Sequence, residues 1–354
     1  MSTPRKGAIF TAGRDDDGRR LERIMRKLFP TVPRSAINKA LRKGDVRIAG
    51  RRVKADHRVE EGDIIEVRAP FAAEAERPEE RVSGKASLIG ARELEILHRD
   101  EHLLALNKPA GIAVHGRDSL TGRVRALLAS QARHSAGASA QAASPRSSLS
   151  FRPGPLHRLD RLTTGVIVFG VSLAGSKRFS AALAGRRLTK VYLALLRGRL
   201  PEPLRWQETL ENEGKRQEAD LSVIPVIHFD SATLAVCVPH TGRTHQIRKQ
   251  AASRGYPLLN DHAYQGGTEQ HLSGSYILHA LSLSAPQELE LGFRSILAPL
   301  PEESANRLGS YAASGSALEL AVPPGELAER LARPVERLRE EPGSASFILT
   351  SIAT

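Results

Sequence analysis

Residues 154–170 read GPLHRLDRLTTGVIVFG, and this stretch decides the fold of the chain. It runs from HRLD, which ends at Asp160, through the polar turn TTG into the apolar run VIVF. This order predicts a buried strand with Asp160 just before its start. A carboxylate at the edge of a core, flanked by Arg158 and Arg161, is costly unless it is paired or used. Asp160 is therefore either a catalytic carboxylate or a structural aspartate that caps the turn.

Two later segments combine a strand pattern with polar side chains. TKVYLAL, residues 189–195, alternates as a strand and carries Tyr192, which is either a half-buried strand tyrosine or a platform for a nucleobase. ATLAVCV, residues 232–238, predicts another strand, which PHTG ends before a helix begins at QIRKQA. Arg243 and Arg248 then lie on or beside one turn, where a guanidinium can bind a carboxylate or phosphate through two parallel bonds.

Upstream, LEILHRDEHLLALNKPAG predicts two short strands and a turn. Lys108 in that turn is either a solvated loop lysine or a phosphate contact. Residues 71–87 are rich in Glu, Ala and Pro without an apolar period, and we interpret them as a linker. Residues 130–150 are of low complexity and lack bulky apolar side chains, so they predict a mobile surface insert.

The N-terminal end predicts a small basic α/β module. RRLERIMRKLF and VPRSAINKALRKG are two short amphipathic helices, the second ending at Gly44, and VRIAGRRV is a strand pair around a glycine turn. The polar side chains expected on the outside of this module are Arg34, Ser35, Lys39, Arg42, Lys43, Arg47, Arg51 and Arg52.

Charge is distributed unevenly along the chain. The 354 residues carry a formal net charge of +13, and residues 1–70 hold 18 Lys and Arg against 10 Asp and Glu. This excess predicts a polyanionic partner, most plausibly nucleic acid, although a solvated basic face is the plainer alternative. The single cysteine, Cys237, excludes an intramolecular disulfide and a cysteine metal cage. Without a secretory signal or an apolar run of about 18 residues, we expect a cytoplasmic protein with no membrane contact.

These segments resemble two known families. The N-terminal module is similar to the RNA-binding module shared by ribosomal small-subunit protein four and several RNA-modifying enzymes. HRLDRLTTG, TKVYLAL and TGRTHQIR together resemble the three signature elements of the RluA-type ribosomal RNA pseudouridine synthases, and NKPAGIAVHG, NDHAY and LHA match in order and spacing. The module points to the RluC- and RluD-like branch. Thr164 stands where the family usually has serine, and it keeps the hydroxyl group.

The resemblance implies isomerisation of uridine to pseudouridine, with large-subunit (23S) ribosomal RNA as the expected substrate. It implies no cofactor, no metal and a monomeric enzyme. Asp160 takes the catalytic position, Arg248 pairs with it through two parallel bonds, and Tyr192 stacks on the uracil. Asp160 attacks the base, attacks the sugar or removes a sugar proton; the sequence leaves these three routes open. We expect base flipping or RNA contact from Arg158, His157, Arg243, Lys108 and Lys190.

The implied fold is α+β, with a long mixed, mainly antiparallel sheet. We expect the RNA-binding module in residues 1–70, the linker in 71–87, the catalytic domain in 88–300 and an extension of unknown role in 301–354. One alternative function is a noncatalytic RNA-binding or ribosome-assembly factor. The other is a metal-dependent hydrolase using His157, Asp160, His240, His245 and His262, whose spacing matches no known ligand pattern.

Overall fold

The computed structural model describes residues 7–68, 94–116, 118–135, 148–212, 214–267 and 274–313. These residues pack into two compact units. The first takes in described residues within Met1–Glu93, Gly122–Gly154 and Val171–Ala174, and the second those within Leu94–Thr121, Pro155–Gly170 and Gly175–Thr354. Among the described helices, none has both the length and the apolar character that crossing a membrane requires.

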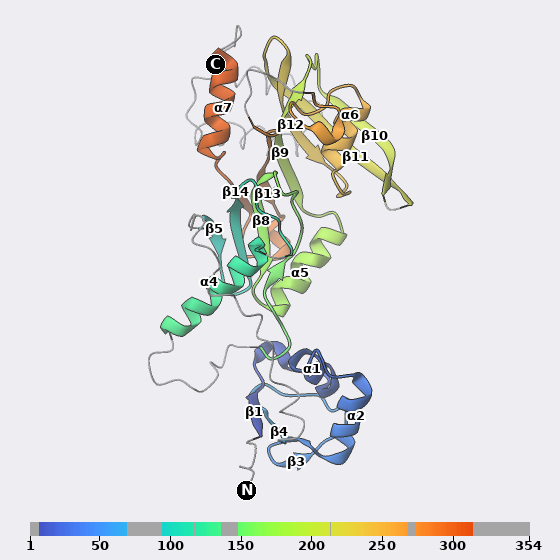
Figure 1. Ribbon diagram of the computed structural model, residues 1–354, viewed down its shortest axis with the longest axis vertical. Coiled ribbons are helices and arrows are strands. Elements are labelled where there is room, and N and C mark those ends of the chain that lie inside the picture. The colour runs from blue at the N-terminus through green and yellow to red at the C-terminus, as the bar shows by residue number, and fades with distance from the viewer. Residues whose placement is uncertain are drawn as a thin grey trace. The chain divides into compact units, whose positions relative to one another are not determined.

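The N-terminal unit contains a four-stranded antiparallel sheet and two helices (Figure 1). Its elements are β1 (Ala8–Thr11), η1 (Arg14–Asp16), α1 (Leu21–Leu28), α2 (Arg34–Lys43), β2 (Val46–Ile48), β3 (Arg51–Arg52) and β4 (Ile64–Val67), with strand order β1-β4-β2-β3. The predicted apolar face of α1, from Leu21 to Leu28, is buried against α2 and the sheet. Gly44 ends α2 in the left-handed conformation, with φ of 78°, as the sequence predicts.

A buried carboxylate fastens the end of the predicted insert to this unit. Asp16 is fully buried and accepts hydrogen bonds from the backbone N–H groups of Leu149 and Ser150, at 2.7 and 3.0 Å, and from the Ser148 hydroxyl. At the other end of the insert, residues 130–135 continue helix α4 (Leu120–Ser135). The prediction of a surface loop over 130–150 was therefore wrong at both ends, because residues 130–135 are helical and Asp16 binds the serine-rich end. The predicted linker and the middle of the insert, 136–147, lie outside the described residues.

The second unit is built on a ten-stranded sheet in the order β10-β11-β12-β9-β13-β8-β6-β5, with β14 beside β13 and β7 beside β8. β13 and β8 pair in parallel, whereas β10–β11, β11–β12, β12–β9, β9–β13, β13–β14, β5–β6 and β6–β8 are antiparallel, so the predicted α+β fold with a mixed, mainly antiparallel sheet is confirmed. The strands are β5 (Ile96–Arg99), β6 (Leu103–Lys108), β7 (Gly154–Pro155), β8 (Thr164–Gly170), β9 (Thr189–Arg197), β10 (Leu204–Asn212), β11 (Lys215–His228), β12 (Ala232–Pro239), β13 (Leu278–Ser284) and β14 (Ser295–Leu297). The helices are α5 (Leu173–Ala184), α6 (Gln246–Ser253), η2 (His262–Tyr264), η3 (Gln287–Leu289) and α7 (Glu302–Ala313).

Alternation along β9 separates two apolar cores. Leu193 and Leu195 pack into one core, whereas Ala194 and Leu196 pack into the other together with Ile247 of α6. Tyr192 also packs against this second core, so it lies on the same face of the sheet as α6.

Strand pairing brings the HRLD segment toward β9. Gly165 in β8 pairs with Ala280 of β13, and Ala280 pairs on its other side with Tyr192. Gly165 has a φ of 103°, and a Cβ atom at this position would lie 2.2 Å from the carbonyl oxygen of Ala280. Glycine is thus required where the turn after Asp160 enters the sheet.

The second unit extends past the predicted boundary at residue 300. Leu308 of α7 is 1% exposed and packs in the core with Val191 and Leu281. Residues 301–313 therefore belong to this unit. The sequence did not predict this, because that stretch contains no recognisable motif. Residues 314–354 lie outside the described part of the chain.

Candidate active site

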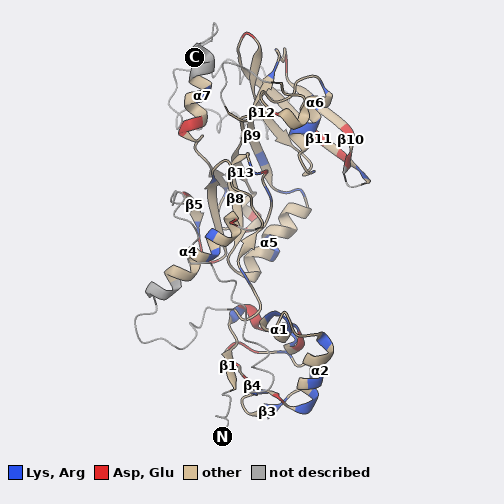
Figure 2. Ribbon diagram, in the orientation of Figure 1, with Lys and Arg blue, Asp and Glu red and all other residues tan. Residues whose placement is uncertain are grey.

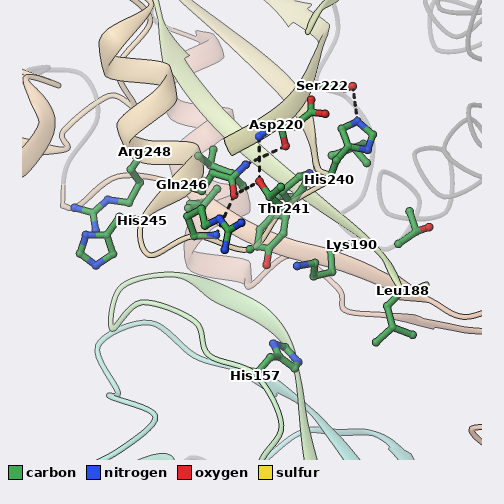
Figure 3. Close-up of a pocket in the computed structure, with 18 of the residues that line it drawn as sticks. His157, Leu188, Lys190, Asp220, Ser222, His240, Thr241, His245, Gln246 and Arg248 are labelled. Atoms are coloured by element: carbon green, nitrogen blue, oxygen red, sulfur yellow. Dashed lines mark hydrogen bonds between the residues drawn. The ribbon is translucent and has the colours of Figure 1, made fainter. Parts of the chain in front are cut away.

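A cleft of about 1270 Å³ lies in the second unit, on the α6 side of the sheet (Figure 3). It is lined by seven of the eight residues predicted for the site, namely Asp160, Tyr192, Arg248, His157, Arg158, Lys190 and Arg243. A second cavity of about 400 Å³ is lined by Arg158, Asp160 and Arg248 as well, together with His115 and Tyr276. Asp160 therefore contributes to the walls of both cavities.

Arg248 contacts Asp160, as predicted, but with one bond instead of two. Its Nη1 donates to Asp160 Oδ2 at 3.0 Å, and the two side chains are 8% and 16% exposed. The two parallel bonds go to Asp261, where Nε and Nη2 donate to Oδ2 and Oδ1 at 2.6 and 2.8 Å. The expectation of a bidentate pair with Asp160 was wrong because a second, fully buried carboxylate occupies that edge of the guanidinium.

Two tyrosine rings contact the guanidinium of Arg248, in addition to the carboxylates that accept its hydrogen bonds. Its Cζ lies 4.8 Å from the ring centroid of Tyr264 and 4.6 Å from that of Tyr276. Burial alone would lower the pKa of Arg248, but the hydrogen bonds with Asp261 and Asp160 and the nearby negative charge raise it above its ordinary value. Arg248 is thus a fixed cation beside Asp160.

His245 lies against the other oxygen of Asp160. Its Nε2 is 3.5 Å from Oδ1, and its Nδ1 is 2.8 Å from the hydroxyl oxygen of Tyr264. The residue precedes α6 in the left-handed conformation, with φ of 55°. Burial lowers the pKa of His245, and the negative charge of Asp160 opposes that shift. His245 is therefore mainly neutral near pH 7 and can act as a hydrogen-bond donor.

Tyr192 is a half-buried phenol in the cleft wall. Burial raises the pKa of Tyr192 well above its ordinary value, and the charge of Asp160 raises it further. The phenol keeps its proton at neutral pH, and its ring belongs to the same wall as Asp160. Its stacking on a uracil stays a prediction.

The remaining predicted cleft residues differ in how free their polar atoms are. His157 accepts a hydrogen bond from the Val168 backbone N–H at 3.0 Å, and burial lowers its pKa to about 3. Arg243 uses its Nε to donate to the carbonyl of Glu218. Lys190 is half-buried, with a pKa lowered by burial, and Arg158 is exposed. RNA contact by these four stays a prediction.

Lys108 is the exception, because its predicted contact with RNA was wrong. The residue is fully buried, and its Nζ donates to the carbonyls of Pro109, Arg161 and Thr163 at 3.0, 2.9 and 2.7 Å. Burial lowers the pKa of Lys108 to about 8, against the attraction of Asp160. The ammonium group stabilises the turn that follows Asp160, where three backbone oxygens converge.

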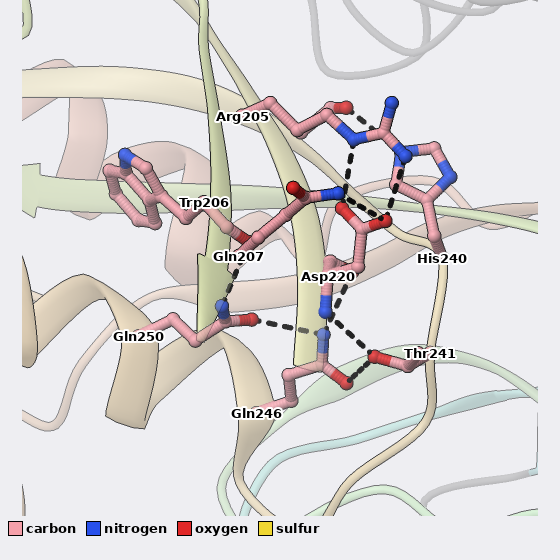
Figure 4. A network of polar contacts seen from close by, with 9 residues as sticks. Arg205, Trp206, Gln207, Asp220, His240, Thr241, Gln246 and Gln250 are labelled. Atoms are coloured by element: carbon pink, nitrogen blue, oxygen red, sulfur yellow. Dashed lines mark hydrogen bonds and ion pairs between the residues drawn. The ribbon is translucent and has the colours of Figure 1, made fainter. Parts of the chain in front are cut away.

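A polar network fixes the start of α6 (Figure 4). The Gln246 side chain accepts from the Thr241 hydroxyl at 2.8 Å and donates to the Asp220 carbonyl and to Gln250, both at 3.0 Å. Gln250 in turn donates to the Trp206 carbonyl at 3.0 Å. These buried amides bind α6 to β10 and β11, so the helix carries Arg248 to a defined position.

Four residues of the site were missed by the sequence reasoning: Asp261, His245, Tyr264 and Tyr276. The signal for Asp261 was its place two residues after the apolar pair Leu258-Leu259, since a buried acid requires a partner. His245 was considered only as a metal ligand. Among the described residues, no group of three or more His, Cys, Asp or Glu side chains could hold a metal ion, so the ligand set of the hydrolase alternative is not assembled.

Figure 2 shows Lys and Arg along α2 of the basic module. Of the eight polar residues predicted on the outside of this module, seven are exposed, and Arg47 in β2 is half-buried. Two of them also support the module itself. Arg52 donates to the carbonyls of Arg42 and Lys43 at 2.9 and 2.7 Å, and Arg47 donates to those of Gly44 and Gly50. Their contact with RNA, like that of the other six, stays a prediction.

Comparisons with known proteins cover both units. A family model described as RNA pseudouridylate synthase matches residues 102–253, and one described as S4 domain matches residues 19–65. Ribosomal large subunit pseudouridine synthase C of Escherichia coli (strain K12) is 34% identical over 271 residues, 71% of this chain and 77% of the relative. The protein of the same name from Vibrio vulnificus is 29% identical over 321 residues, 84% and 94% of the two chains.

Two solved structures share the fold. Human RNA Pseudouridylate Synthase Domain Containing 4 aligns with a TM-score of 0.51 at 23% identity, over 64% of this chain and 94% of its own. Human RNA Pseudouridylate Synthase Domain Containing 1 aligns with a TM-score of 0.50 at 21% identity, over 70% and 95%. At these identities the likeness concerns the fold alone.

Proposed function

Because this chain belongs to the RNA pseudouridylate synthase family, we propose that its substrate is large-subunit ribosomal RNA and that Asp160 is its catalytic carboxylate. The chain is an isomerase that converts uridine to pseudouridine in RNA. The relatives named above act, by their names, on the large ribosomal subunit, and this supports the same substrate class here. The same names argue against the noncatalytic alternative.

The reaction exchanges one bond to the sugar for another. The bond from C1′ to N1 of uracil breaks, the detached base turns, and a bond from C1′ to C5 forms. The proton on C5 is lost and N1 gains one, so the atoms of substrate and product balance. The three routes open to Asp160 all begin with the ionised carboxylate.

The observation that carries the proposal is the position of Asp160 in the cleft. A fixed guanidinium lies 3.0 Å from one of its oxygens and places a positive charge beside the carboxylate. Tyr192 lies in the same wall, close enough for the carboxylate charge to raise its pKa. Its ring is a suitable surface for a uracil, as base–aromatic stacking contributes about 1–3 kcal/mol per base.

The uridine must leave its stack to reach Asp160, at a cost of a few kcal/mol. We assign Arg158 to the vacated space, because it is exposed and lines both cavities beside Asp160. His157, Lys190 and Arg243 are assigned to RNA contact in the same cleft. The basic module supplies phosphate contacts that hold the RNA without reading its bases. We place the enzyme in the cytoplasm, where bacterial ribosomal RNA is made, and take it to be monomeric.

The experiment is pseudouridine mapping on unmodified RNA transcripts. The purified full chain and its Asp160→Asn variant are incubated with large-subunit and small-subunit ribosomal RNA. We expect pseudouridine at defined positions of the large-subunit RNA with the wild type only, and unchanged RNA affinity of the variant. Pseudouridine on other RNA alone would contradict the substrate, and turnover by Asp160→Asn would contradict the catalytic assignment.

A further inference from the structure

The two oxygens of Asp160 face different partners, and one short turn contacts both partners. Arg248 donates to Oδ2 at 3.0 Å, and His245 Nε2 lies 3.5 Å from Oδ1. Arg248 is bound by Asp261 and His245 by Tyr264. Asp261 and Tyr264 lie at the two ends of the single turn η2.

This turn is itself held in place by backbone contacts. The Tyr264 and Gly266 N–H groups both donate to the Asp261 carbonyl, at 3.0 and 2.9 Å, and the Asp261 N–H donates to Leu258 at 3.1 Å. A Cβ atom at Gly266 would lie 2.1 Å from the Leu258 carbonyl oxygen. The chain approaches itself so closely that only glycine fits, and Asp261 and Tyr264 therefore have little freedom.

Asp261 determines which edge of the Arg248 guanidinium is available. It accepts from Nε and Nη2 at 2.6 and 2.8 Å, and it is 1% exposed on its side chain. Two parallel bonds fix the plane of a guanidinium as well as its position. With that edge occupied, Nη1 remains directed at Asp160.

Tyr264 determines which nitrogen of His245 carries the proton. Burial raises the pKa of the Tyr264 phenol, so at neutral pH its O–H is intact and can donate to His245 Nδ1. A neutral imidazole that accepts at Nδ1 carries its hydrogen on Nε2. That N–H then faces Asp160 Oδ1, where 3.5 Å makes the contact electrostatic rather than a fully formed hydrogen bond.

We propose that Asp261 and Tyr264 are positioning residues of the isomerisation: Asp261 aims Arg248 at one oxygen of Asp160, and Tyr264 sets the His245 tautomer that faces the other. The inference rests on the proposed catalytic role of Asp160. Neither residue touches the substrate in this account, since each acts through another side chain.

The pH–rate profile depends on the charged and titratable groups around these residues. The charged or titratable groups near His245 are Asp160, Arg248, Lys249, Arg158 and Tyr264. Those near Asp160 also include Lys108, Tyr192 and Tyr276. Without the Tyr264 hydroxyl, the Nδ1–H tautomer of His245 competes and turns the Nε2 lone pair toward the carboxylate. The contact between His245 and Asp160 then changes from attractive to repulsive, and the pH–rate profile changes with it.

The first test is Tyr264→Phe in the full chain, with single-turnover rate and RNA affinity measured over a range of pH. We expect the rate to fall about three- to tenfold, as for one lost hydrogen bond, with RNA affinity unchanged and a pH–rate profile that differs from that of the wild type. The matched control is Tyr256→Phe, which removes a phenolic hydroxyl from a ring that stacks on Trp206. This control should leave rate and pH profile at wild-type values.

The second test asks whether Tyr264 acts through His245. In a His245→Gln background, whose amide presents an N–H whatever Tyr264 does, Tyr264→Phe should have no further effect on rate or pH profile. An equal fall in both backgrounds would overturn the tautomer role. The rate of the Asp160→Asn variant is measured in the same experiment. Turnover by that variant would contradict the catalytic role of Asp160 and not only the role of Tyr264.

The third test is Asp261→Asn, whose amide cannot accept from both edge N–H groups. We expect a rate about tenfold lower at unchanged RNA affinity, because Arg248 loses its fixed plane. Tyr264→Phe changes one oxygen atom and keeps the test decisive if Asp261→Asn unfolds. Wild-type rate and pH profile in both variants would overturn the proposal.

Discussion

The catalytic cleft and the basic module both use arginine, but they hold it in opposite ways. Arg248 in the cleft is 8% exposed and bonds to two carboxylates. Arg34 in the module is 67% exposed and forms an ion pair with Glu22 at 2.8 Å. A charge in a low-dielectric site interacts strongly with its neighbours, whereas an exposed charge is screened by salt within about 10 Å.

The difference indicates a division of labour between the two regions. In the cleft, a cation with a fixed plane can orient the carboxylate of Asp160. Exposed cations such as those of the module attract phosphates in general but do not orient a reacting atom.

The largest effect is expected from Arg248→Lys, which keeps the charge and loses the planar fork. A lysine cannot bind Asp261 with two parallel bonds and also reach Asp160, so the single-turnover rate should fall about 10²-fold. RNA affinity should stay near the wild-type value. Arg254→Lys, at the exposed end of α6, is the control, and a wild-type rate for Arg248→Lys would show that charge alone is sufficient.

Acid should destabilise the catalytic unit through its buried histidines. His279 accepts from the Thr164 hydroxyl and donates to the Ala298 carbonyl, and burial lowers its pKa from 6.5 to about 4. As the pH falls below 6.5, His279 binds a proton in the unfolded chain, whereas in the folded protein it does so only near pH 4. The group's contribution to stability, about 3 kcal/mol, is therefore present above pH 6.5 and lost by pH 4.

Urea unfolding followed by fluorescence of Trp206 measures this effect, because the only tryptophan of the chain lies in the catalytic unit. The His279→Gln variant keeps a donor and an acceptor but does not titrate. Its unfolding free energy should depend less on pH than that of the wild type between pH 6.5 and 4. Parallel pH profiles of the two proteins would contradict the assignment.

The smallest effect is expected from neutralising the outer face of the module. Lys39, Arg42, Lys43 and Arg51 are exposed, and their simultaneous change to glutamine removes charge without removing buried groups. Affinity for structured RNA should fall about tenfold at low salt, and the salt slope of the affinity should decrease by about 3. Glutamine at three or four exposed basic positions outside the module and the cleft serves as the control, and an unchanged slope would assign the module another role.

The parts predicted correctly from the sequence are those that local pattern encodes. The α1 and α2 helices follow from apolar spacing and Gly44. The contact between Asp160 and Arg248 joins distant segments, and it was expected only because two long motifs resemble a known family. Other contacts between distant segments were missed. Lys108 lies in a stretch that reads as a turn, yet its partners come from residue 109 and from residues 161 and 163. The link between Asp261 and Arg248 likewise depends on how a turn packs against a helix, which neither periodicity nor propensity encodes.

The most direct test of this division of labour is the single-turnover rate at saturating RNA, measured for Arg248→Lys and for the quadruple glutamine variant of the module. Saturation removes the effect of weaker binding, so only changes in the chemical step remain. The account predicts that the module variant reaches the wild-type rate while Arg248→Lys remains about 10²-fold slower. A module variant that stays slow at saturation, or an Arg248→Lys enzyme restored to the wild-type rate, would contradict it.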